Sequence, residues 1–170
     1  MAGILKDPLL DIAGFLLWVM MALTAFFGSL FLFGILAAIF FYGQAIAQTG
    51  SATVFWTMEL GLLLVAGILA MCFLFLRHMK RIVDSVGEGD PFIPENADRL
   101  TAMAWLMLAI QVVGIVLGPV AEYVVNAFGE GHTASEYDFG GGLVLILTLF
   151  ILARVFRKGT EMREDLEGTV

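Results

Sequence analysis

The chain has 170 residues, of which 60% are hydrophobic and 15% charged. Soluble domains are about half apolar and about a quarter charged, so this composition argues against an ordinary soluble domain and favours a protein of the lipid bilayer. The net charge of −7 argues against direct nucleic-acid binding, because contacts with phosphates need a basic face.

Four segments are long and apolar enough to be read as membrane spans, since a bilayer core of about 30 Å takes roughly 20 residues of helix. Residues 14–41 carry no charge and exceed that length, so this helix is expected to tilt or to begin in the interface. The others are 54–76, 101–125 and 139–156. Because lipid cannot satisfy an open backbone, helices are expected throughout. We predict an all-α fold, a single membrane domain over residues 1–170 built as an integral membrane four-helix bundle.

The cations predict the orientation of these spans. All nine Lys and Arg precede the first span, lie between the second and third, or end and follow the fourth, whereas 42–53 and 126–138 contain none. Cytoplasmic loops carry the excess of Lys and Arg. Both termini, the middle loop 77–100 and the tail 157–170 are therefore expected in the cytoplasm.

The middle loop is expected to be partly helical. Residues 77–83 continue the second span, with cations placed to meet anionic head groups. The glycines and proline of 87–91 predict a turn. Pro94 and Glu95 suit the first turn of the next helix, where proline loses no hydrogen bond and an acid favours the helix dipole.

The tail has two interpretations. Val155, Met162 and Leu166 are spaced close to a helical stripe, with acidic residues on other positions. This pattern fits a frayed extension of the fourth span, and it also fits a docking surface built together with the middle loop.

Polar residues inside predicted spans are functional candidates. Glu59 lies about one turn into the second span and is expected at the interface rather than buried. Gln111, near the middle of the third span, is expected to hydrogen-bond between helices. Glu122 lies near the outer end of that span, at the surface or facing an outer vestibule. Gly114 and Gly118 have the spacing that lets helices pack closely.

An enzyme is not expected, and neither is a metal or cofactor. His78 and His132 are predicted on opposite sides of the membrane, without ligands at metal-binding spacing. A carrier would need polar midplane groups and interrupted, repeated helices.

Two short motifs carry a resemblance to a known family. The first is Gly89-Asp90-Pro91-Phe92 with Glu95-Asn96 and Arg99-Leu100. The second runs from Phe156 to Met162 and continues in Glu164-Asp165-Leu166 and Thr169-Val170. With them the whole chain resembles the bacterial domain of unknown function 2975 family in length and in span order. A small helix-capping residue is usual in that family where Ile93 stands here.

The resemblance implies a small four-span protein of the bacterial cytoplasmic (inner) membrane. Such proteins are often encoded beside a helix-turn-helix transcription regulator, which implies that they restrain the regulator or report to it. A non-enzymatic membrane regulator or anchor with a cytoplasmic protein partner is therefore expected. The residues expected to bind that partner are Asp90, Pro91, Phe92, Glu95, Asn96, Arg99, Gly159, Glu164 and Asp165.

Two alternatives stay open. The phenylalanine-rich, charge-free first span offers a large surface to lipid or to other membrane subunits, which would suit an accessory subunit of a larger complex. A small carrier or channel is the third hypothesis, and it would act through Gln111 or Glu122. The expected partners are thus the lipid bilayer with a cytoplasmic protein or membrane subunits, and an oligomer is compatible with each hypothesis.

Overall fold

The computed structural model describes residues 8–129 and 139–167, and every regular element within them is an α-helix. In chain order the elements are α1 (Pro8–Phe40), α2 (Tyr42–Thr49), α3 (Ala52–Gly87), α4 (Pro94–Ala127) and α5 (Phe139–Glu167). The all-α class is confirmed. Lys6, His132 and residues 168–170, on which sequence expectations also rest, lie outside the described residues.

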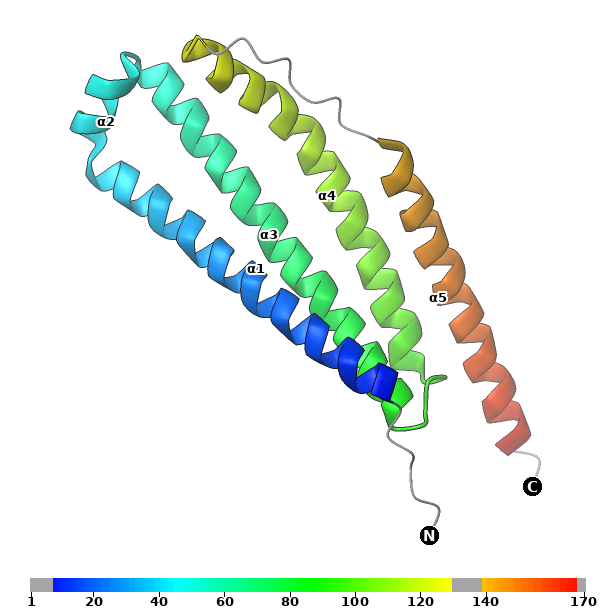
Figure 1. The fold of residues 1–170 in the computed structure, drawn as a ribbon. Coiled ribbons are helices and arrows are strands. Elements are labelled where there is room, and N and C mark those ends of the chain that lie inside the picture. Colours follow the sequence, from blue (N-terminus) through cyan, green and yellow to red (C-terminus); the bar gives the residue numbers. More distant parts are fainter. Residues whose placement is uncertain (1–7, 130–138, 168–170) are drawn as a thin grey trace.

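The four long helices form one row and not a closed bundle (Figure 1). In the described part of the chain, α1 packs on α3, α3 on α4 and α4 on α5, and no other pair of long helices is in backbone contact. The predicted bundle is wrong in this respect. Lipid is as apolar as leucine, so helices in a bilayer gain little by closing around a common core.

The two ends of the described chain lie at the same end of the row of helices. The start of α1 and the end of α5 are at the same end of the row as the connection between α3 and α4, whereas α2 is at the other end (Figure 1). The placement of Lys and Arg in the sequence predicts this arrangement, with both ends and the α3–α4 connection on the same side of the membrane. The side of the membrane on which this end lies stays a prediction.

Within residues 8–129 and 139–167, three helices are long and apolar enough to cross a membrane, namely α1, α3 and α4. The 36 residues of α3 correspond to about 54 Å at 1.5 Å per residue, well beyond a hydrocarbon core of about 30 Å. Its helix therefore continues past the predicted span 54–76, as expected for residues 77–83. The predicted span 139–156 forms the first part of α5, which is not one of the three helices, and its membrane crossing stays a prediction.

Helix α2 lies in a segment that the hydropathy pattern predicts as a loop. This eight-residue helix ends at Gly50, whose φ of 69° lies in the left-handed region and whose N–H donates to Ile46 O. Its first residue, Tyr42, packs edge-on against Phe55 of α3, with ring centroids 5.0 Å apart. Phe55 has no exposed surface. This aromatic contact joins the α1–α3 connection to the start of α3.

The main apolar core lies between α4 and α5, toward the end that holds the α3–α4 connection. Its buried members are Leu100, Met103, Ala104, Leu149 and Ala153, with Phe75 and Ile82 of α3 among the partly buried side chains around it. By contrast, the only buried residue of α1 is Leu17. The fold is therefore best packed around the α4–α5 pair, and α1 covers one side of α3 alone.

The polar residues within the predicted spans have different environments. Glu59 is 6% exposed, and neither carboxylate oxygen has a hydrogen-bond partner among the described residues. Glu59 is therefore buried within the protein, against the expectation, whereas its depth in the membrane stays a prediction. Glu122 is exposed.

Gln111 and the glycine pair show how α4 meets its neighbours. Gln111 is 5% exposed, and its Oε1 has no hydrogen-bond partner among the described residues. It packs against Gly142 of α5 so tightly that a Cβ there would overlap its amide. Gly114 is buried, but a Cβ on Gly118 would meet nothing within 4 Å. The close approach thus occurs at Gly142, which the spacing argument did not single out.

Candidate functional site

The connection between α3 and α4 is a tight, hydrogen-bonded turn. The N–H of Glu88 donates to Asp84 O at 3.0 Å, and that of Asp90 donates to Ser85 O at 3.1 Å. Gly89 has a φ of 85°, a conformation that glycine adopts without steric cost. Pro94 then occupies the first turn of α4, as predicted. Ile93 at the N-cap makes no side-chain cap, which fits its apolar character.

Asn96 lies at the centre of this turn. It is 0% exposed, and its Nδ2 donates to Ser85 Oγ at 2.7 Å and to Pro91 O at 2.9 Å. Its Oδ1 accepts a hydrogen bond of 2.7 Å from Arg99 Nη1, which also donates to Arg81 O near the end of α3. One amide thus ties together α3, the turn and α4. A buried amide with its partners in place fixes one geometry, because each lost bond leaves a desolvated polar group.

Phe92 connects the turn to α5 through two contacts. Its ring lies 5.3 Å from that of Phe156, at an interplanar angle of 39°. One turn further along α5 the ring rests on the backbone at Gly159, where a Cβ would lie 2.7 Å from Cδ1 of Phe92. Any larger residue at position 159 would displace the ring or the helix.

Two ion pairs flank this aromatic contact. Arg163 of α5 pairs with Asp90 of the turn, and Arg157 Nη2 lies 3.1 Å from Asp98 Oδ1 of α4. The side chains of the second pair are 59% and 76% exposed. Exposed ion pairs contribute about 0–1 kcal/mol each to stability. These two pairs therefore orient α5 relative to the turn and add little to the stability of the contact. We call the residues Asp90, Phe92, Phe156, Gly159 and Arg163 the tail clamp.

The predicted partner-binding residues therefore divide into two sets. Asp90, Pro91, Phe92, Asn96, Arg99 and Gly159 are brought together, and they contact one another or their neighbours within the chain. Asn96 in particular offers no surface to a partner. Glu95, Glu164 and Asp165 are exposed.

Sequence reasoning missed several members of this site. Ser85 and Asp98 carried no signal of their own, because nothing in a single sequence pairs α3, α4 and α5 at these positions. Phe156 and Arg157 belong to the second motif, but their contacts with Phe92 and Asp98 were not predicted. Arg163 was counted only as a cation that orients the spans. The spacing of Arg157 and Arg163 by about two turns on α5, opposite two aspartates of the 77–100 segment, was the signal available for a tail contact.

His78 lies on α3, just beyond the predicted span. Burial lowers its pKa below the ordinary value, and the nearby charges of Arg81, Arg77 and Arg99 lower it further. Its Nδ1 is buried without a hydrogen-bond partner among the described residues. His78 is therefore held in its neutral form beside the network of Asn96 and Arg99.

Among residues 8–129 and 139–167, no three His, Cys, Asp or Glu side chains come together to hold a metal ion. The side chains that do come together pair charge with charge and ring with ring.

The comparisons with known proteins give one match. The chain matches the family described as protein of unknown function (DUF2975) over residues 16–170. No curated protein and no solved structure matches it. The match extends from the predicted first span through the turn and the whole of α5, so it includes every residue of the tail clamp. The chain belongs to the DUF2975 family.

Proposed function

We propose that this protein is a non-enzymatic membrane regulator or anchor that binds a cytoplasmic protein partner. The observation that carries the proposal is the tail clamp. A tail that merely frayed from the membrane would need no ring contact and no ion pair with a turn 64 and 73 residues earlier in the chain. Holding α5 against the α3–α4 turn gives a partner one fixed surface instead of a loose peptide.

The exposed side of the tail supplies that surface. Met162 and Leu166 are 54% and 73% exposed and lie one turn apart on α5, beyond the predicted span. An apolar pair at this spacing is what a groove on a partner recognises in an amphipathic helix. Glu164 is exposed beside them, and Glu95 lies on the neighbouring start of α4. We therefore assign recognition to this face, with Asn96 and Phe92 as its internal support.

The orientation and the partner follow from the sequence. The end of the molecule that holds the turn and the tail also holds the Lys and Arg residues of α3 and α5, so we place it in the cytoplasm of a bacterial cell, with the helices in the cytoplasmic membrane. The family resemblance suggests a helix-turn-helix transcription regulator as the partner.

The test is retention of a purified helix-turn-helix regulator, encoded beside this gene, by the detergent-solubilised full chain. Replacing Met162 and Leu166 together by serine is expected to abolish retention. The matched control replaces Leu9 and Ile12 by serine, because these are 73% and 56% exposed and lie at the same end of the molecule on α1. Retention by the tail variant, or equal loss in both variants, would count against the assigned face.

A second function is favoured by the open row of helices. Between α1 and α3 there is an apolar groove of about 630 Å³, lined by small residues that include Ala25, Gly28, Ser29, Ala66 and Gly67. Small residues let another helix approach closely, so an accessory subunit of a larger membrane complex would bind here. Co-purification of membrane subunits that Gly28→Leu displaces, while the tail variant keeps them, would favour this alternative.

A further inference from the structure

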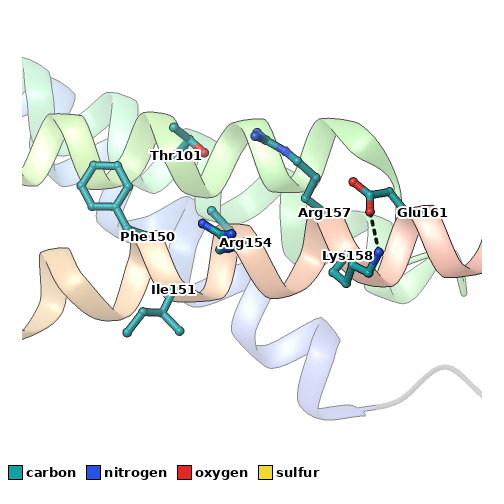
Figure 2. A pocket seen from close by; sticks show the side chains of 8 residues that line it. Thr101, Phe150, Ile151, Arg154, Arg157, Lys158 and Glu161 are labelled. Atoms are coloured by element: carbon teal, nitrogen blue, oxygen red, sulfur yellow. Dashed lines mark hydrogen bonds and ion pairs between the residues drawn. The ribbon is translucent and has the colours of Figure 1, made fainter.

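A groove of about 780 Å³ opens between α4 and α5, next to the tail clamp (Figure 2). One part of its lining is apolar and includes Phe150 and Ile151; the other is charged, with Arg154, Arg157 and Lys158 against a single carboxylate, Glu161. These four side chains have a net charge of +2, and Asp98, which pairs with Arg157, brings the net charge of this end to +1. The groove is therefore apolar at one end and cationic at the other.

The cations are available to a ligand. Figure 2 shows Arg154 and Arg157 on the side of α5 that faces α4, with Thr101 across from them. Among the described residues Arg154 makes no ion pair or hydrogen bond. Arg157 pairs with Asp98 at 3.1 Å and Lys158 with Glu161 at 3.0 Å, through side chains that are 59% and 69% exposed. Exposed pairs of this kind are weak, so a ligand anion can replace or share either one.

The groove crosses the predicted edge of the bilayer. The third predicted span begins at Thr101 and the fourth ends at Phe156, so Arg154 lies in the last turn of the fourth span and the other charged residues of the lining lie just beyond it. Phe150 and Ile151 are thus at the depth of acyl chains, whereas Arg157 and Lys158 are at the depth of head groups. A soluble anion would use the cations alone, but a phospholipid would use both parts of the lining.

We propose that this groove binds an anionic glycerophospholipid. Its phosphate lies between Arg154 and Arg157, whose planar guanidinium groups match phosphate oxygens in pairs, and one acyl chain lies along Phe150 and Ile151. Basic pockets between helices at the cytoplasmic edge of a membrane bind anionic head groups in this way. The bound lipid would fill the space between α4 and α5 directly beside the clamp, and it is separate from the partner-binding face at Met162 and Leu166.

The fluorescence of Trp105 reports whether a lipid occupies the groove. Its ring stacks edge-on against Phe150, with centroids 5.6 Å apart, and the chain has 3 Trp, so Trp18→Phe with Trp56→Phe leaves this one alone. The protein is reconstituted in phosphatidylcholine nanodiscs with increasing phosphatidylglycerol, and either lipid carries bromine on its acyl chains. Brominated phosphatidylglycerol is expected to quench Trp105 more strongly than brominated phosphatidylcholine at the same mole fraction.

Variants of single arginines test whether the preference for phosphatidylglycerol arises in the groove. Arg154→Gln is expected to lower the preference for phosphatidylglycerol by about fivefold, and Arg154→Lys is expected to retain most of it. The matched control is Arg77→Gln, an exposed cation beyond the predicted span of α3 and outside the groove, which should leave the preference unchanged. Native mass spectrometry of the chain with all its tryptophans repeats the comparison without the Trp substitutions.

Three results would overturn the proposal. Equal quenching by the two lipids would show that the groove has no preference for an anionic head group. Equal effects of Arg154→Gln and Arg77→Gln would show a diffuse surface charge. Loss of the preference on adding millimolar inorganic phosphate or glycerol phosphate, which lack acyl chains, would show a site for soluble anions.

Discussion

The ring of Phe92, in the α3–α4 turn, lies so close to Gly159 of α5 that a Cβ at position 159 would come within 2.7 Å of it. The two residues are far apart in sequence and belong to the two motifs by which the chain resembles its family. Their contact brings the two motifs together, and each motif supplies one half of the clamp that holds the tail.

Gly159→Ala is expected to destabilise the protein by about 1 kcal/mol, since overpacking costs about 1–3 kcal/mol and alanine in a helix returns about 0.5–1 kcal/mol. Thermal unfolding in detergent, followed by circular dichroism, measures the change. The control is Gly118→Ala in α4, where a Cβ meets nothing within 4 Å, and there the midpoint should rise. Rises of equal size in both variants would contradict the contact.

Gly142→Ala is expected to cost more, about 2–3 kcal/mol. The Cβ would lie 1.1 Å from Nε2 of Gln111, and this amide is 5% exposed, so it cannot swing into open space. Gln111→Ala should relieve the collision, so the double variant should be more stable than Gly142→Ala alone. A double-mutant cycle in detergent tests this, and additive effects would show that the two residues do not touch.

Asn96→Ala is expected to cost about 2–3 kcal/mol, because it removes the amide that bonds Ser85 and Pro91 and leaves buried polar groups without partners. The neighbouring substitution Glu95→Ala, at an exposed position, should change stability by less than about 0.5 kcal/mol. Unfolding midpoints in mild detergent compare the two. If Asn96→Ala changed stability as little as its control, the hydrogen bonds of Asn96 would have no structural role.

His78 predicts a dependence on pH. Burial and the charges of Arg81, Arg77 and Arg99 lower its pKa in the folded state, so the unfolded chain binds a proton more readily. Stability should therefore fall as the pH drops from above the ordinary value of about 6.5 toward the lowered pKa of the folded state. His78→Gln removes this contribution. The difference in unfolding midpoint between the two proteins should grow between pH 7.5 and pH 5.5 in favour of the variant; a constant difference would refute the assignment.

Much of this architecture could be predicted because its causes are local. The turn follows from Gly89 and from the proline at position 94, and the long helices follow from apolar runs that no other backbone could satisfy in lipid. The family resemblance, confirmed by the match over residues 16–170, also rested on contiguous motifs. Each of these signals lies within a few residues of the feature that it predicts.

The features that could not be predicted depend on contacts between residues that are distant in the chain. Hydropathy gives every helix an apolar surface but does not say which helix covers it, so it does not distinguish a row from a bundle and does not predict that Glu59 is buried. The same gap affected Asn96. A polar residue beside a turn is equally consistent with an outward docking contact and an inward hydrogen bond, and only the placement of Ser85 and Pro91 decides between them.

The row of helices has a consequence for biogenesis. Each long helix packs on the long helix that precedes it in the chain, so a span leaving the ribosome finds its neighbour already made. No helix has to wait for a later one before its contact surface can form. The tail clamp needs both the turn and α5, so it closes last. Its closure would mark a completed chain, and a product truncated before Phe156 would expose the turn with Phe92 uncovered.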